Sequence, residues 1–282
     1  MMRRNGGIPE PALSFARRPA NDRREMDIDR THEACQLAPR PLAAMASSHP
    51  DGEIIQPHHH PRAQLVHAIA GVMTITCPPG SWVVPSGRAV WMPAGIIHAI
   101  RIAGQVEMRT VFVAPDARPE LPRDCEVIEV SPLLRALVVA ATRLPFDYDI
   151  SGRDGRIMEL ILDEVQLAPR LSMHVPMPRD ARLAKLCDTM IADPAAPVTL
   201  DSLAADHAMS SRTLARLFHK ELGISFGEWR RRMRLLLSLP RLAAGASILE
   251  VALEHGYQSP SAFAAMFKRT FGIAPSHYLG DD

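Results

Sequence analysis

Two hydrophobic patterns divide the chain. Between about residues 51 and 115, short apolar or β-branched runs alternate with Pro and Gly, as is typical of closely spaced β-strands in a sandwich or small barrel. The runs lie at residues 64–69, 72–76, 82–84, 89–92 and 106–113. We therefore expect a β-rich domain in the N-terminal half.

The pattern changes after Ser131, where apolar residues recur at steps of three and four. This periodicity predicts two amphipathic helices. Two interpretations of their apolar faces remain, a dimer interface or packing against the β-rich domain. The apolar positions are Leu133, Leu134, Leu137, Ala140 and Ala141 in the first helix and Ile157, Leu160, Ile161 and Val165 in the second.

Residues 175–178 read Val-Pro-Met-Pro and predict a linker, because proline cannot continue a helix and holds its predecessor extended. Everything beyond them is predicted to be helical. The fold class is thus α+β with two domains, an N-terminal β-barrel followed by helices and a C-terminal all-α domain. The boundaries we expect are a disordered tail at 1–25, a barrel at 26–130, connecting or dimerisation helices at 131–170, a linker at 171–178 and the helical domain at 179–282.

The helical domain contains an internal repeat. The string DHAM at 206–209 matches EHGY at 254–257 with an offset of 48 residues, and residues 214–224 match 263–273 with an offset of 49. The difference of one residue falls at Gln258, and it marks a turn because turns tolerate insertions. Each copy is predicted to be a helix, a short turn and a second helix, which is helix-turn-helix architecture.

The second helix of such a unit enters the major groove of DNA, where its outward side chains meet base edges. In the first copy these positions hold Ser211, Arg212, Thr213 and Arg216. Arginine there can donate two hydrogen bonds to guanine. Alternatively, Arg216 could pair with a nearby carboxylate such as Glu221.

A helix over 226–244 joins the copies and would span roughly 28 Å, near the roughly 34 Å between successive major grooves on one side of DNA. A plain all-α domain would explain neither the repeat nor the polar face. The arginine run at 230–234 lies on this helix, where it can be a solvated face or a phosphate-binding surface.

This half resembles the AraC/XylS family of bacterial transcription regulators over about residues 179–278. The matching strings are LAA at 203–205, MSSRTL at 209–214, RLF at 216–218, EVA at 250–252, GY at 256–257, SPSAF at 259–263, FKR at 267–269 and PSHY at 275–278. The resemblance implies a double helix-turn-helix on one long helix. The DNA-binding residues it implies are Ser211, Arg212, Thr213, Ala215, Arg216 and Lys220 in the first copy, and Gln258, Ser259, Pro260, Ser261, Ala264, Ala265 and Lys268 in the second.

Two residues depart from the family pattern. Ala265 stands where the family often has arginine, so base reading by the second copy should be weak. Pro240 lies inside the connecting helix and should kink it, because proline removes one backbone hydrogen bond and clashes with the preceding turn.

The β-rich half carries a second spaced pattern. Gly52, His58, His60, Gln64 and Gly71 are separated by five, one, three and six residues, and Gly87, Pro93, Gly95 and His98 by five, one and two. These spacings resemble the paired motifs of the cupin superfamily, a small double-stranded β-helix barrel. In metal-binding cupins the matching set of two histidines, a carboxylate and a third histidine converges on the metal.

The corresponding metal set here is His58, His60, Gln64 and His98, in which Gln64 replaces the carboxylate and leaves a weaker, neutral donor. Three interpretations remain: a divalent transition metal, a metal-free pocket for a small ligand, or a purely structural barrel. His59 and His67 compete for the assignment, and only the motif spacing favours the four residues named.

Composition agrees with a globular protein. Hydrophobic residues make up 47% and charged residues 22%, which excludes a mostly disordered chain. No apolar run reaches the roughly 18 residues of a membrane span, and the Arg-rich N-terminus lacks the apolar centre of a secretory signal. Four cysteines lie far apart and suggest neither a zinc ribbon nor a disulfide framework. We expect a cytoplasmic protein with no membrane partner.

These observations predict a non-enzymatic transcription regulator. The barrel would sense a small molecule or a metal, and the helical domain would bind double-stranded promoter DNA. The resemblance implies a homodimer and leaves room for RNA polymerase as a further partner. The alternative is a cupin metalloenzyme, such as a dioxygenase or isomerase, which would have no use for two spaced recognition helices. A nonspecific nucleoid-type binder would need a stronger positive charge than the net +1.

Overall fold

The computed structural model describes residues 31–78 and 80–278, so the tail expected at 1–25 lies outside the described residues. The sensor region begins with a short helix and seven strands: α1 (His32–Gln36), β1 (Leu42–His49), β2 (Ile54–His58), β3 (Ala63–Cys77), β4 (Gly80–Pro85), β5 (Arg88–Met92), β6 (His98–Val113) and β7 (Glu126–Glu129). It ends with α2 (Pro132–Ala141), α3 (Arg153–Leu167), β8 (Arg170–Leu171) and β9 (His174–Pro176).

Two long strands, β3 and β6, organise the sheet. They pair with each other twice, residues 63–68 with 108–113 and residues 72–76 with 99–103, and the register shifts between these stretches. Around the first stretch the strand order is β1-β6-β3-β5-β7-β8; around the second, β2 pairs with β6, and β4 lies between β3 and β9. The two long strands thus belong to both halves of one folded sheet.

The expected fold class is confirmed, with a cupin-like β domain followed by helices and then a helical domain, although the sheet is not a closed barrel. Within the described residues β1 pairs only with β6 and β8 only with β7, so the sheet keeps free edges. The last strands are very short, two residues in β8 and three in β9. The N-terminal region is therefore a cupin-like sheet that stays open.

The helices α2 and α3 pack on this sheet. Leu134 and Val138 of α2 and Ile161 of α3 are buried in one core with Trp91 and Val111. Packing on the sheet thus explains most of their apolar spacing. Two of the predicted apolar positions are not buried in this core, since Leu133 is 47% exposed and Leu160 is 37% exposed.

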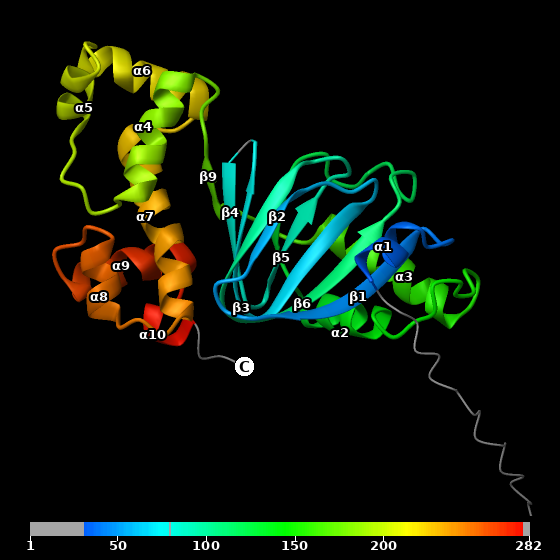
Figure 1. Ribbon diagram of the computed structural model, residues 1–282. Coiled ribbons are helices and arrows are strands. Elements are labelled where there is room, and N and C mark those ends of the chain that lie inside the picture. Colours follow the sequence, from blue (N-terminus) through cyan, green and yellow to red (C-terminus); the bar gives the residue numbers. More distant parts are fainter. Residues whose placement is uncertain (1–30, 79, 279–282) are drawn as a thin grey trace, which may run out of the picture.

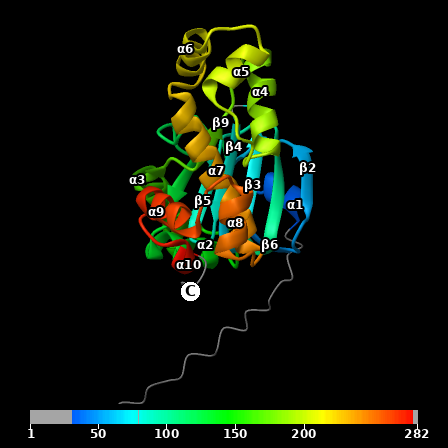
Figure 2. The ribbon, with the colours of Figure 1, turned by 90° about the vertical axis from the view of Figure 1, so that its left-hand side faces the viewer.

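The remaining helices form two similar units at opposite ends of α7, as both views show (Figures 1 and 2). The elements are α4 (Ala181–Ala192), α5 (Leu200–Asp206), α6 (Ser211–Leu222), α7 (Phe226–Ala243), α8 (Ile248–Glu254), α9 (Pro260–Phe271) and α10 (Pro275–Tyr278). The repeat is confirmed as the pairs α5–α6 and α8–α9. Among the described residues, none of the helices combines the length and apolarity that crossing a bilayer requires.

The turns of the two units have the same geometry. Ala208 and Gly256 occupy equivalent positions with positive φ, 52° and 71°. In both copies the next residue donates a backbone hydrogen bond to the first helix of the unit. Met209 N–H donates to the Ala204 carbonyl, and Tyr257 N–H donates to the Ala252 carbonyl. Each second helix starts at a serine cap and ends at a left-handed glycine, so the sequence repeat becomes a structural one.

The connecting helix α7 also packs against the sheet, across which it runs in Figure 2. Trp229 is buried there, and its indole N–H donates to the Pro176 carbonyl at 2.8 Å. Pro176 lies on β9, which pairs with β4, so the segment expected as a linker is part of the sheet. Pro240 lies in the last turn of α7, and the helix continues past it to Ala243.

The bend of β3 gives a test of the fold. Gly71 has φ +75°, and a Cβ there would lie 2.5 Å from the Gln105 carbonyl oxygen. Gly71→Ala should lower the free energy of unfolding by about 2–4 kcal/mol, through left-handed strain and this clash. Urea denaturation followed by tryptophan fluorescence measures the change.

Gly87→Ala is the matched control, since Gly87 has φ +73° and no atom within 4 Å of its Cβ position. Only the left-handed strain of about 1–2 kcal/mol should remain there. Equal losses in the two variants would contradict the role assigned to the close approach at Gly71.

Candidate DNA-reading face and effector pocket

The helix α6 presents a basic face to solvent. Leu214 and Phe218 are buried against the rest of the unit, whereas Arg212, Arg216 and Lys220 on the other face are exposed. Ala215 lies half-buried between them. The guanidinium groups of Arg212 and Arg216 are thus open to solvent in the described structure.

The two hydroxyl groups on this face already have partners. Ser211 Oγ donates to the Asp201 carboxylate, and Thr213 Oγ1 is 2.9 Å from Ser210 Oγ. These two hydroxyl groups therefore help to fix the start of α6.

Arg216 does not pair with Glu221. The Glu221 carboxylate instead accepts the backbone N–H groups of Arg179 and Asp180, at 3.1 and 3.2 Å. Within the described residues Arg216 takes part in no ion pair. Its side chain remains available for an outside partner.

The equivalent face of α9 is nearly without charge at its start. Phe263 and Phe267 are buried, while Ser261, Ala265 and Lys268 are exposed. Of the other predicted residues, Ser259 caps the helix, Pro260 and Ala264 are half-buried, and Gln258 is exposed in the turn. The two reading faces are thus chemically unequal.

Two arginines of the 230–234 run make hydrogen bonds inside the domain. Arg230 donates to the Val198 carbonyl at 2.7 Å, and Arg234 donates to the carbonyls of Pro194 and Gly256 at 2.8 and 3.1 Å. The two interpretations of the run, a solvated face or a phosphate-binding surface, therefore rest mainly on its other arginines. Arg231 remains exposed.

A pocket of about 640 Å³ opens in the sensor region, with walls from both halves of the sheet and from α1. Met45, Ile55, Val66, Ile100 and Met108 form its apolar wall. Its polar lining is unusual in composition, because six histidines contribute to it: His32, His49, His58, His59, His60 and His98.

The structure brings the four candidate ligands of the sequence together in this pocket. The His58 ring lies 4.7 Å from that of His60 and 4.4 Å from that of His98, between ring centroids. Gln64 lines the same pocket and is 4% exposed. Of the competing residues, His59 is exposed, and His67 is buried outside the pocket with Nδ1 on the Arg88 carbonyl.

Two of these donors fit a metal or a polar ligand for a further reason. Within the described residues, Gln64 Oε1 and His98 Nε2 are buried without a hydrogen-bond partner. Such groups are rare because an unpaired buried polar atom is costly. A bound ligand in the pocket would satisfy both.

The pocket favours neutral imidazoles. The pKa of His60 is lowered to about 3, mainly by burial and to a smaller extent by the positive charge that neighbouring histidines would carry. Burial likewise lowers the pKa of His98 and of His32. Neutral rings keep a nitrogen lone pair, which a metal or a hydrogen-bond donor can use.

His32 was missed by the sequence analysis. It lies on α1, outside both cupin-like motifs, yet its Nε2 is 3.1 Å from Nε2 of His60. The Thr31 hydroxyl caps α1 by accepting the Ala34 N–H, and His32 is the first residue of that helix. No spacing connects residue 32 with the motif at 58–64.

A second hollow of about 660 Å³ lies against α2. Its lining contains Arg88, Arg135 and Arg143, but no buried polar side chain faces it. The convergence of buried polar groups therefore favours the histidine pocket as the ligand site.

Comparisons with known proteins agree with this division of the chain. Residues 42–163 match the family model described as an AraC-like ligand binding domain, and residues 203–281 match one described as a helix-turn-helix domain. The HTH-type transcriptional regulator NimR of Escherichia coli is 32% identical over 222 residues, which cover 79% of this chain and 81% of NimR.

Two further likenesses are more distant. The HTH-type transcriptional regulator RipA of Corynebacterium glutamicum is 33% identical over a stretch that covers 48% of this chain and 40% of RipA. A match to a solved structure of ToxT from Vibrio cholerae covers 85% of this chain and 98% of the ToxT chain, with 13% identity and a TM-score of 0.36.

The unequal faces of α6 and α9 predict unequal base reading. Arg216→Ala should cost about 1–3 kcal/mol on the cognate sequence and relax preference at one base pair, as loss of a bidentate guanine contact does. Ser261→Ala should cost less, since only one hydroxyl is removed. Binding-site selection with the full-length chain measures both; equal loss of sequence information in the two half-sites would refute the asymmetry.

Proposed function

The chain belongs to the AraC family of HTH-type transcriptional regulators, and we propose that it reads promoter DNA mainly through α6 while the histidine pocket binds the effector. The observation that carries this proposal is the arrangement of the helical region. Two helix-turn-helix units lie at opposite ends of α7, whose 18 residues make it about 27 Å long. That length suits two recognition helices in successive major grooves.

The residues proposed to contact DNA follow from exposure and charge. Arg212 and Arg216 are suited to base edges, and Lys220 and Lys268 to phosphates. The start of α9 offers Ser261 and otherwise small apolar groups, so its contribution is mainly to shape and position.

The effector is proposed to be a small molecule or a metal held by His58, His60, Gln64 and His98. Their convergence in one pocket and the unpartnered atoms of Gln64 and His98 support this. The apolar wall opposite would suit an apolar part of a small ligand.

We propose that the protein is not an enzyme. The pocket carboxylate nearest in sequence to the motif, Glu53, pairs with His49 at 3.0 Å and is not among the four converging residues. The relatives reported above are named as transcriptional regulators. A cupin metalloenzyme is therefore the weaker interpretation.

The test of this function uses the full-length chain with sheared DNA from the genome that encodes it. Bound fragments should share one sequence motif, and fusing their promoters to a reporter should show expression that changes when the gene is deleted. The Arg212→Ala/Arg216→Ala double variant should lose the motif while keeping its fold by circular dichroism. No preference over competitor DNA would contradict the proposal.

The protein is further proposed to act as a cytoplasmic homodimer that can contact RNA polymerase at its promoters. Leu133 and Leu160, left exposed on α2 and α3, offer an apolar surface for a second copy. Sedimentation should therefore show a dimer at micromolar concentration, and Leu133→Glu should shift it to monomer. A wild-type monomer under these conditions would contradict the dimer.

A further inference from the structure

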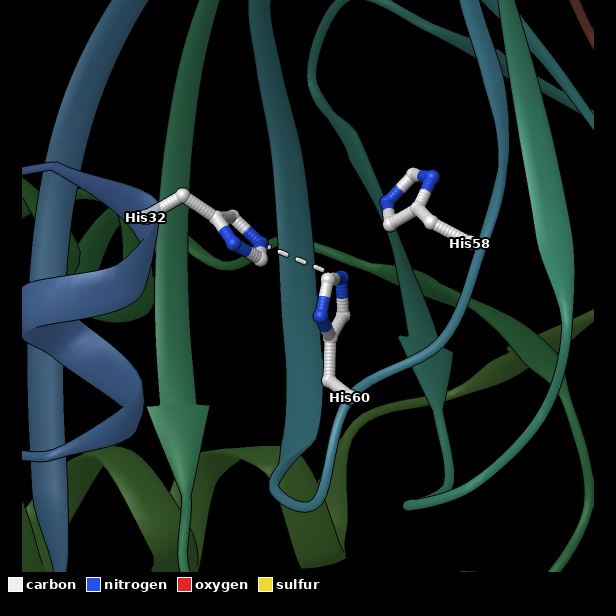
Figure 3. A group of neighbouring side chains, drawn as sticks. All are labelled: His32, His58 and His60. Carbon is white, nitrogen blue, oxygen red and sulfur yellow. Dashed lines mark hydrogen bonds between the residues drawn. The ribbon is translucent and has the colours of Figure 1, made fainter.

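Four imidazole rings lie close together in the pocket, and one of them comes from outside the two motifs that supply the others. Between ring centroids, His32 is 4.1 Å from His60 and 6.0 Å from His58, and His60 is 5.3 Å from His98. One ring nitrogen from each of His32, His58 and His60 falls within 4.8 Å of the others. Figure 3 shows the His32 ring reaching from α1 toward His60, with His58 on the far side.

Hydrogen bonds to the backbone orient two of the rings for metal binding. His58 Nδ1–H donates to the Gln56 carbonyl at 2.7 Å, and His98 Nδ1–H donates to the Ile96 carbonyl at 2.9 Å. In a neutral ring this bond leaves the lone pair on Nε2, and in His98 that atom is buried without a partner. Metal-binding histidines characteristically donate their other N–H in this way, which fixes the tautomer.

The chain holds His32 in place independently of any ligand. Cys35, three residues further along α1, is buried in a small core with Phe112. The His32 ring meets Phe112 edge-on at 5.0 Å between centroids. His32 thus belongs to a packed element and is not part of a free tail.

Arg62 secures the same segment from the other side. Its guanidinium donates to the carbonyls of Gln36, Ala38, Arg40 and Pro41, at 3.1, 2.6, 3.0 and 3.0 Å. Arg62 is two residues from His60, so the loop that carries His60 also fixes the segment that follows His32. The relative position of these two ligands is preorganised.

We propose that His32, His58, His60 and His98 bind one divalent transition metal as a four-histidine site. His32 supplies the fourth donor in place of the cupin carboxylate. The position of that carboxylate in the sequence holds Gln64, which is a weaker donor. The inference rests on the proposed function and specifies its effector as a metal of the imidazole-preferring class, such as Zn²⁺, Ni²⁺, Co²⁺ or Cu²⁺. Tetrahedral Zn²⁺ has bonds of about 2.0–2.1 Å, so the His98 ring, which lies outside the group of nitrogens within 4.8 Å of one another, must move toward the other three.

The experiment titrates Co²⁺ and Zn²⁺ into the untagged, metal-stripped full-length chain. Wild type should bind one ion per chain, with the visible ligand-field bands of four-coordinate Co²⁺. His32→Ala should weaken binding by at least about ten-fold, because losing a ligand costs no less than losing a supporting contact. His207→Ala is the control, since His207 is an exposed histidine that does not line the pocket, and it should bind as wild type does.

A ligand exchange separates coordination from folding. His32→Cys should keep the ion and add thiolate-to-Co²⁺ charge-transfer absorption, which a purely structural role for His32 would not produce. Gln64→Ala should retain most of the affinity, and a loss as large as that of His32→Ala would reassign the fourth donor to Gln64 and overturn the proposal.

The outcomes distinguish this inference from the proposed function. Sequence-specific DNA binding without stoichiometric metal would overturn the four-histidine site and leave the regulator intact. Metal binding without DNA preference would do the reverse. Wild-type affinity and spectrum in His32→Ala, or no charge-transfer band in a metal-bound His32→Cys, would remove His32 from the site.

Discussion

The buried face of α7 is the contact on which the two parts of the protein depend. Trp229, Met233 and Leu236 are buried in a core that continues into the sheet, and the Trp229 indole N–H is satisfied by β9. The first helices of the two DNA-reading units, α5 and α8, have only seven residues each. Helices this short are not stable alone, so the units need the packing surface that α7 provides.

The histidine pocket follows from a different constraint, the cost of placing charge in a confined space. Several imidazoles so close together cannot all be protonated, and burial reinforces this by lowering the pKa of His60, His98 and His32. These three rings therefore favour the neutral form, in which one nitrogen keeps its lone pair.

Local patterns in the sequence were enough to predict most helices and strands and the internal repeat. The helix-turn-helix pairs follow from residues close in the chain, such as the serine caps and the glycines Gly223 and Gly272. The cupin-like spacings correctly grouped His58, His60, Gln64 and His98 in one pocket. These successes share a cause, because spacing within an element or a hairpin determines which side chains share a face.

What the sequence did not show depends on contacts between distant segments. The role of Arg230 depends on carbonyls more than 30 residues away, and a charge run gives no sign of them. The short strands β8 and β9 join the sheet by pairing with β7 and β4, and they form at the start of the expected linker and within it. His32 joins the pocket through the packing of Cys35 and the bonds of Arg62, neither of which produces a spacing.

The attachment of both reading units to α7 has a consequence for regulation. The helix α6 contacts α7 directly, and α9 is connected to α7 through α8. Because α7 also packs on the sheet, a change in the sheet at Trp229 would reach both units through this one helix.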